Sequence, residues 1–135
     1  MRTVRVLVFA LAALLLLDGA ALARSVIRKS GSIVAEIDGS YLREGGSIVA
    51  EFDGTYVRKS GSIVLEFDGR YVRKGGSILA EIDGHYLRKG GSIAWEIESN
   101  GTVRRSGSIA YQVDDYTDSD GMKQKVAAFL LLFAE

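Results

Sequence analysis

Along most of this chain, the pattern of apolar and polar residues repeats every 15 residues. The unit reads G-S-I-x-x-E-[IF]-D-G-x-Y-[LV]-R-[KE]-[SG], and successive copies are 15 residues apart four times and then 16. The Ser of each Ser-Ile pair is Ser32, Ser47, Ser62, Ser77, Ser92 and Ser108. Repetition at a short fixed period is typical of architectures built by stacking one small unit.

Each unit contains two predicted strands, exemplified by residues 32–37 and 40–43. Both segments are rich in β-branched and aromatic residues and are bounded by glycine, which favours strands joined by tight turns. The Asp38-Gly39 pair between them is typical of a two-residue type I′ hairpin turn. The sequence therefore predicts a 15-residue hairpin repeat.

The register of the first hairpin follows from that turn. A loop of Asp38 and Gly39 pairs Ala35 with Leu42 and puts Ile33 on the same apolar face. The next connection, residues 44–46, preserves the two faces if it is a three-residue loop. A one-residue slip would turn every side chain over, so we expect that longer loop.

The repeats predict an all-β fold, an antiparallel meander closed into a flower-like or barrel-like ring. Half-units remain at the two ends of the repeat region, residues 25–29 and 108–113, and their pairing would remove the exposed sheet edges. The alternative is a β-solenoid with parallel strands and one coil per unit. The Asp-Gly turns favour the hairpin architecture.

The first 23 residues have the pattern of a secretory signal peptide. Arg2 and Arg5 precede an apolar run over residues 6–17, and Ala21-Leu22-Ala23 is a small-x-small cleavage site. The run is shorter than the roughly 20 residues of a membrane-spanning helix, which disfavours an uncleaved anchor. We expect cleavage after Ala23, export to the periplasm or the medium, and no membrane span in the mature chain.

The repeat domain is predicted over residues 24–113, followed by two further segments. Residues 114–125 are polar and acidic and are interpreted as a linker. Residues 126–135 are almost wholly apolar and are expected to form a last strand or a plug over one mouth of the ring. The alternative is an exposed patch for a partner.

Composition excludes several classes of protein. The chain has 17 Lys+Arg, 17 Asp+Glu and no Cys, which argues against a nucleic-acid binder, a disulfide scaffold and a thiol enzyme. It contains no nucleophile elbow, no phosphate loop and no metal-spaced histidines, and its single histidine, His85, is expected at the surface. The near-equal glutamates provide no distinct acid and base. We expect no catalytic residue, cofactor or metal.

The face opposite the predicted core presents repeated tyrosine and arginine side chains. Aromatic rings beside guanidinium groups suit the stacking and hydrogen bonding of sugars or of an acidic polymer. The candidate binding residues are Tyr41, Tyr56, Tyr71, Tyr86, Arg43, Arg58, Arg73 and Arg88. The alternative is a solubilising charge ladder, in which the arginines pair diagonally with glutamates such as Glu36.

Two stretches, residues 54–64 and 100–109, resemble the repeats of the five-fold β-flower proteins, a bacterial, signal-peptide-bearing family of unknown function. The resemblance implies a closed flower of antiparallel hairpins and no known activity. Tyrosine replaces the smaller residue of the family pattern in several repeats. We expect an exported, non-enzymatic structural or interaction protein of the cell envelope, with a glycan or another envelope component as partner. The alternative is a secreted carbohydrate-binding or polyanion-binding module.

Overall fold

The computed structural model describes residues 24–134, which form twelve strands and one helix. The first six strands are β1 (Arg24–Lys29), β2 (Ser32–Asp38), β3 (Tyr41–Glu44), β4 (Ser47–Asp53), β5 (Tyr56–Lys59) and β6 (Ser62–Asp68). The remaining elements are β7 (Tyr71–Lys74), β8 (Ser77–Asp83), β9 (Tyr86–Lys89), β10 (Ser92–Ile97), β11 (Thr102–Arg105), β12 (Ser108–Asp114) and α2 (Asp120–Phe133). The predicted signal peptide, residues 1–23, lies outside the described residues.

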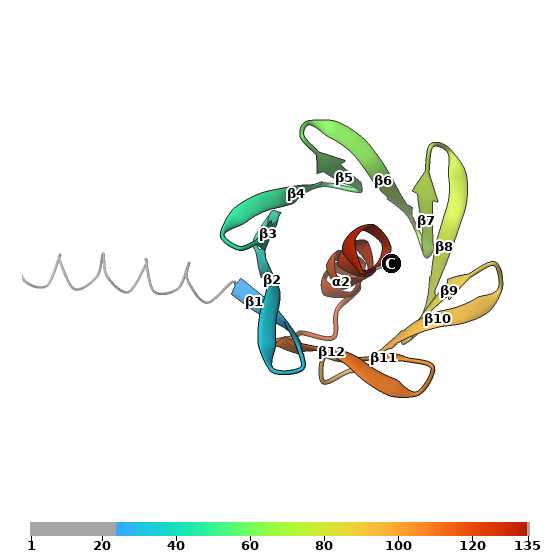
Figure 1. Ribbon diagram of the computed structural model, residues 1–135. Helices are drawn as coiled ribbons and strands as arrows, with labels where there is room; N and C mark the ends of the chain where they lie inside the picture. The colour runs from blue at the N-terminus through green and yellow to red at the C-terminus, as the bar shows by residue number, and fades with distance from the viewer. Residues whose placement is uncertain (1–23, 135) are drawn as a thin grey trace, which may run out of the picture.

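The strands form a closed antiparallel barrel in which each strand pairs with its neighbours in sequence and β1 closes the ring against β12 (Figure 1). The closing pair sets Ile27 opposite Val113, as the two half-units predict. We call each hairpin of a short and a following long strand a petal; the petals are β1–β2, β3–β4, β5–β6, β7–β8, β9–β10 and β11–β12. The all-β ring is confirmed, and the β-solenoid is wrong because its strands would be parallel.

The Asp-Gly turn differs by one residue from the prediction. Asp38 lies opposite Tyr41, so the two loop residues are Gly39 and Ser40 rather than Asp38 and Gly39. Gly39 has a φ of +59°, whereas Ser40 is not among the residues with positive φ. That combination is the type II′ turn, which requires glycine at its first central position only. Asp38 therefore lies outside the turn and is the last residue of β2.

The petal tips also differ from the prediction, with a consequence for the surface. The tip of β3–β4 is a two-residue turn, Gly45-Gly46, with both φ angles positive, as a type I′ turn requires. A β-bulge follows it, because Leu42 pairs with Ala50 whereas Arg43 pairs with Ile48. The extra residue turns Ile48 to the outer face. The predicted three-residue loop and the inward position of the isoleucine after each Gly-Ser are therefore wrong, whereas Ile37 is buried as predicted.

The C-terminal segment forms a helix that lies inside the ring (Figure 1). It is therefore a plug and not the last strand of the sheet. Ser119 caps the helix by accepting a hydrogen bond from the Met122 backbone N–H at 3.2 Å. The helix begins at Asp120, so the acidic connection is shorter than predicted. Residues 126–131 are all buried, as expected of a helix surrounded by protein on every side.

The core lies between the inner faces of the strands and α2. It consists mainly of one or two inward residues per strand, such as Leu42, Leu65 and Val103, together with Phe129 and Leu130 of the helix. Six contiguous buried residues of α2 thus replace the side chains that would otherwise have to fill the barrel. Over the described residues, no helix is long and apolar enough to cross a membrane.

Candidate binding site between the petals

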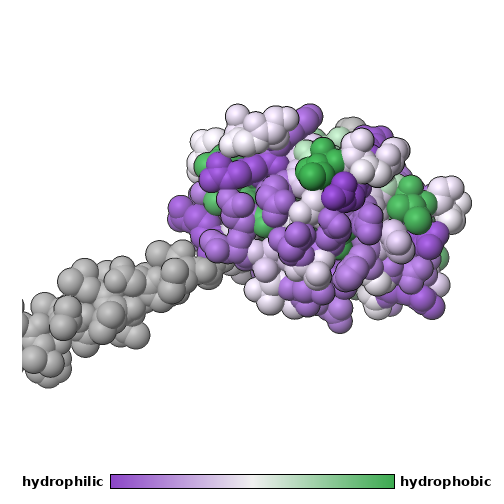
Figure 2. Space-filling model, turned by 90° about the horizontal axis from the view of Figure 1, so that it is seen from below, coloured by the Kyte–Doolittle hydropathy of each residue, from purple (hydrophilic) through white to green (hydrophobic). Residues whose placement is uncertain are grey.

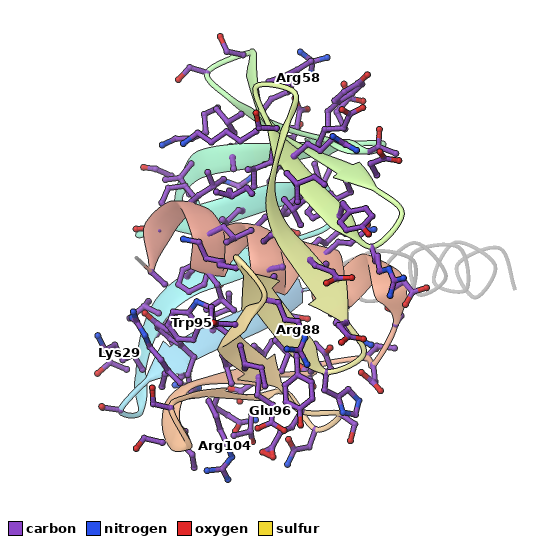
Figure 3. All side chains as sticks on the ribbon, turned by 90° about the vertical axis from the view of Figure 1, so that its right-hand side faces the viewer. Lys29, Arg58, Arg88, Trp95, Glu96 and Arg104 are labelled. Atoms are coloured by element: carbon purple, nitrogen blue, oxygen red, sulfur yellow. The ribbon has the colours of Figure 1, made fainter. Side chains whose placement is uncertain are left out.

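The predicted tyrosines and arginines occupy equivalent positions on the outer face of four short strands. Each tyrosine begins its strand and each arginine is the third residue of the same strand, as in Tyr56 and Arg58 of β5. Tyr56 and Tyr86 are 37% exposed, and Tyr41 and Tyr71 are slightly more buried. In Figure 3, Arg58 and Arg104 project from opposite sides of the ring. The outer location predicted for these side chains is observed.

The arginines already make structural contacts. Arg58 Nε donates a hydrogen bond to Asp53 Oδ2 at 3.0 Å, and Arg58 Nη1 donates one to the Gly61 carbonyl at 3.2 Å. Arg73 repeats both contacts with Asp68 and Gly76. Each arginine therefore ties the end of one long strand to the turn of its own petal. This use of the guanidinium groups leaves them less available to a ligand.

The predicted glutamate–arginine ladder has different partners in the structure. Glu51 lies directly opposite Arg58 instead of diagonally, because the turn register differs by one residue. The ion pair of Arg58 is nevertheless made with Asp53, with Nε and Oδ2 3.0 Å apart. The guanidinium carbon of Arg58 also lies 5.9 Å from the centre of the Tyr56 ring, within the range of a cation–π contact.

Grooves separate neighbouring petals, because two petals pair only near their inner ends. In β4 and β5 the pairing runs from Asp53 opposite Tyr56 to Glu51 opposite Arg58, and the strands diverge beyond that point. The resulting groove has a volume of about 490 Å³. Its lining is Tyr41, Ile48, Val49, Ala50, Glu51, Arg58, Lys59, Ser60, Gly61 and Phe133.

Two further grooves repeat this construction around the ring. The groove between β5–β6 and β7–β8 has a volume of about 260 Å³ and contains Tyr56, Glu66 and Arg73. The next groove, of about 190 Å³, contains Tyr71 and Arg88 in the same places. Each groove thus combines the tyrosine of one petal with the arginine of the next, a pairing that the single-hairpin interpretation did not include.

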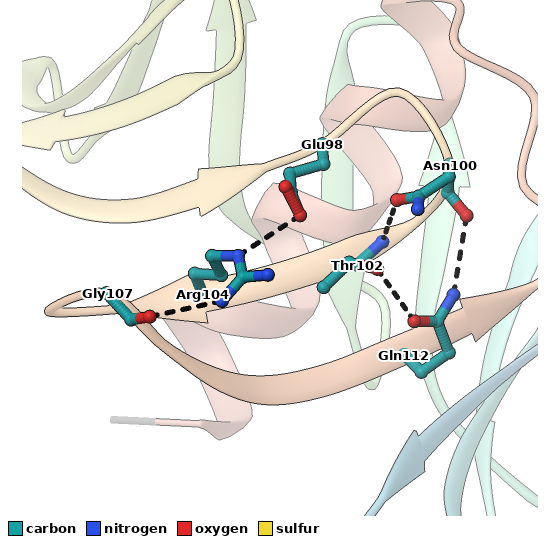
Figure 4. A network of polar contacts seen from close by, with 6 residues as sticks. All are labelled: Glu98, Asn100, Thr102, Arg104, Gly107 and Gln112. Carbon is teal, nitrogen blue, oxygen red and sulfur yellow. Dashed lines mark hydrogen bonds and ion pairs between the residues drawn. The ribbon is translucent and has the colours of Figure 1, made fainter.

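The repetition is interrupted near the end of the ring. Thr102 replaces the tyrosine in β11, is buried, and donates from its hydroxyl to Gln112 Oε1 at 2.8 Å (Figure 4). Gln112 Nε2 donates to the Asn100 carbonyl at 3.3 Å, and Arg104 binds Glu98 in place of an aspartate (Figure 4). The groove between β11–β12 and β1–β2, of about 320 Å³, accordingly has Gln112 where the others have glutamate.

Sequence reasoning missed two contributors to these grooves. The isoleucine after each Gly-Ser was assigned to the core, yet Ile48, Ile63 and Ile78 are 50–55% exposed and line the three tyrosine grooves. Phe133 reaches the largest groove from the carboxyl end of α2. The Gly-Gly or Ser-Gly pair two residues before each isoleucine was the available signal, since a type I′ turn followed by a bulge changes which face a residue occupies.

Tyr116, His85 and Trp95 are not among the residues that line the grooves. Burial, with a smaller contribution from the Asp118 carboxylate, raises the pKa of Tyr116, which lies in the connection to α2. His85 Nε2 lies 3.6 Å from Asp118 Oδ2 and the side chain is partly exposed. Among the described residues, no cluster of three or more acidic or histidine side chains has metal-binding geometry. Trp95 packs in the core 6.0 Å from the Tyr111 ring.

Comparison with known proteins identifies one family. The family model described as "6-fold beta flower protein" matches residues 9–126. Neither the curated proteins nor the solved structures provide a significant match. Sixfold repetition agrees with the six petals of the ring and corrects the fivefold expectation.

Proposed function

The chain belongs to the 6-fold β-flower family, and on that premise we propose that it is an exported, non-enzymatic binding protein of the bacterial cell envelope. Its ligand occupies the grooves between the petals. The observation on which this proposal depends is the repetition of one groove, with a tyrosine, an exposed isoleucine and a glutamate, around the ring.

The repetition favours binding over catalysis. General acid–base chemistry needs two groups whose environments hold their pKa values apart. The groove glutamates Glu51, Glu66 and Glu81 instead occupy equivalent positions in successive units, each beside the arginine of the next petal. Equivalent weak sites suit a ligand that is itself repetitive, because simultaneous contacts raise the overall affinity well above that of one site.

A carbohydrate is the ligand class that the groove chemistry favours. Half-exposed tyrosine rings stack on sugar faces, and glutamate oxygens accept hydrogen bonds from sugar hydroxyls. A soluble polyanion fits the grooves less well, since Arg58 and Arg73 are already bonded to aspartates and Glu51 and Glu66 add negative charge. We therefore rank an envelope glycan first among the ligands of the grooves.

The proposal is tested by a binding screen against envelope glycans and acidic polymers. The protein is recovered from the exported fraction, with its N-terminus expected at Arg24. A variant with alanine at Tyr41, Tyr56, Tyr71 and Tyr86 is compared with a control that changes the neighbouring turn residues Ser40, Thr55 and His85, which line none of the grooves. We expect saturable glycan binding that weakens at least about tenfold in the tyrosine variant, since each lost stacking contact costs about 0.5–1.5 kcal/mol.

The control separates the groove from the rest of the surface. Equal weakening in both variants would place the glycan outside the grooves. An intact N-terminus in a cytoplasmic fraction would contradict export, and absence of binding to every glycan would remove carbohydrates as the ligand class.

A further inference from the structure

The two ends of the ring are built from different turns. At one end, Lys123 Nζ and Lys125 Nζ near the start of α2 donate to the carbonyls of Gly84 and Gly39, which belong to the Asp-Gly turns. At the other end, Lys59 of a petal tip lies 5.0 Å from the ring of Phe133, at the carboxyl end of α2. Because tips and Asp-Gly turns alternate along the closed antiparallel meander, all six tips lie on the side of the ring where the helix ends, and we call this side the tip end.

The tips repeat one chemical composition. Each has a charged residue, a two-residue turn of Ser-Gly or Gly-Gly, a serine and an isoleucine. The charged residues are Lys29, Glu44, Lys59, Lys74, Lys89 and Arg105, so five of the six tips are basic. The serines and turn residues of all six tips are exposed.

Aromatic side chains direct three of these cations toward the mouth of the ring. Arg105 lies 4.8 Å from the Trp95 ring, Lys59 lies 5.0 Å from Phe133, and Lys29 lies 5.9 Å from Tyr111. Figure 3 shows Lys29 projecting at the edge of the molecule. The carboxyl end of α2 offsets only about half of one positive charge through its helix dipole. The tip end is therefore cationic.

Away from the tips the described chain is acidic. Residues 24–134 contain 15 Lys+Arg and 15 Asp+Glu, and five of the basic residues but only one acidic residue, Glu44, lie at the tips, which leaves ten basic and fourteen acidic residues elsewhere. Six of these carboxylates end the long strands or their connections, each paired with an arginine: Asp38, Asp53, Asp68, Asp83, Glu98 and Asp114. The chain has no net charge as a whole, yet its positive and negative groups are displaced along the ring axis. A charge distribution of this kind orients a protein with its basic end toward an anionic surface.

Exposed isoleucines accompany the cations. The six tip isoleucines are 50–63% exposed, with Ile63 at the lower limit and Ile109 at the upper. Figure 2 shows apolar patches on one face that are small and separated by hydrophilic surface. Isolated exposed isoleucines do not by themselves indicate membrane binding, but beside lysines they can reach the boundary between headgroups and acyl chains once the cations hold the tips at the surface. A continuous protein interface would instead require one contiguous patch.

We propose that the tip end docks on a bilayer surface rich in anionic phospholipids. Lysines and Arg105 contact headgroup phosphates, the tip serines donate hydrogen bonds to phosphate oxygens, and the isoleucines reach the acyl boundary. This docking goes beyond the glycan binding proposed above and does not depend on it, because it uses the cations at the ends of the petals. The two proposals share the tip isoleucines Ile48, Ile63 and Ile78, which also line the grooves, so a docked ring would cover the tip side of each groove.

Vesicle co-sedimentation tests the proposal with a matched pair of variants. The chain from Arg24, which contains the whole closed ring, is mixed with vesicles of phosphatidylglycerol and phosphatidylethanolamine or of neutral phosphatidylcholine. Lys29→Gln/Lys74→Gln removes two tip charges, whereas Arg24→Gln/Arg70→Gln removes two exposed charges away from the tips. We expect binding to anionic vesicles only, weakened about tenfold by the tip variant and by half-molar salt, and unchanged by the control.

A gain of affinity provides an independent check. Glu44 is the one acidic tip residue, and its buried Oε2 has no hydrogen-bond partner among the described residues. Glu44→Lys restores the composition of the other tips and is expected to strengthen binding to anionic vesicles about fivefold or more. Thermal melting confirms that each variant is folded before its binding is compared.

Three outcomes would overturn the proposal. One is equal binding to neutral and anionic vesicles, and another is equal weakening by the tip variant and the control. The third is failure to bind vesicles while binding soluble polyphosphate, which would assign the tip end to a soluble polyanion. The groove variant with four alanines should bind vesicles normally, so failure of lipid docking and failure of glycan binding are distinguishable.

Discussion

A single glycine allows the backbone conformation that is needed where this ring departs from a uniform repeat. Gly101 closes the longer connection between β10 and β11, has a φ of +90°, and is buried. Its carbonyl accepts a hydrogen bond from the Val113 N–H at 2.8 Å, while the Tyr116 side chain covers its α-carbon. The extra residue of the fifth repeat is thus accommodated by one position where a side chain has no space.

We predict that Gly101→Ala destabilises the protein far more than Gly54→Ala. A Cβ at Gly101 would collide with the Val113 carbonyl and lie 2.8 Å from Tyr116 Cβ, whereas one at Gly54 would meet nothing within 4 Å. Both substitutions incur about 1–2 kcal/mol of left-handed backbone strain. Gly101→Ala adds about 1–3 kcal/mol of overpacking. Urea unfolding measures both, and equal losses of unfolding free energy would contradict the prediction.

At the scale of the element, the sequence identified every strand but misassigned the helix. The repeats place a long and a short strand in each unit, and those strands are observed. The tail was expected to be a strand or a plug because an apolar run alone does not distinguish strand from helix. Its Ala, Leu, Lys and Gln content favours a helix, and Ser119 supplies the cap.

The plug should contribute to stability through its buried face. We predict that Leu130→Ala, at a fully buried position, lowers the unfolding free energy by about 2–5 kcal/mol. Leu132→Ala, at a half-buried position two residues later, should cost about 1 kcal/mol, since part of its side chain is already in water. Similar effects from the two leucines in chemical denaturation would show that α2 does not fill the ring.

At the scale of the whole molecule, closure depends on one seam between the ends of the repeat region. β1 pairs with both β2 and β12, and Arg28 Nε binds Asp114 Oδ2 across the seam at 2.6 Å. Without β1, two neighbouring strands would each present an unpaired edge, which is a template for association between molecules. The pairing of β1 with β12 therefore determines whether the barrel is closed.

We predict that a chain beginning at Gly31 associates through its open strand edges. Removing β1 opens the edges of β2 and β12 and also deletes the buried Ile27. Light scattering should show soluble aggregates, and the melting temperature should fall, in contrast with a chain beginning at Ser25 that retains nearly all of β1. A monomeric species with unchanged melting would mean that the seam does not hold the ring together.

For the candidate site too, the sequence predicted some features and only the tertiary structure decided the others. The sequence predicted that tyrosines and arginines share an outer face, because period-two alternation assigns faces within a strand. It did not predict that the arginines bind Asp53 or Asp68, or that each tyrosine faces the next petal across a groove. Those contacts depend on how far two neighbouring hairpins diverge, which no local pattern specifies.

The sequence by itself determined the repeat, the strands and the pairing of the two half-units, because glycine turns and alternation act over a few residues. The tertiary structure decided the turn register, the outward isoleucines and the helical plug. A bulge changes the face of Ile48 with no change in composition, and the apolar tail becomes a helix inside a ring that must be filled along its axis. The plug depends on residues that are distant in the chain, whereas the turn register and the bulge depend on the exact backbone geometry of a few turn residues.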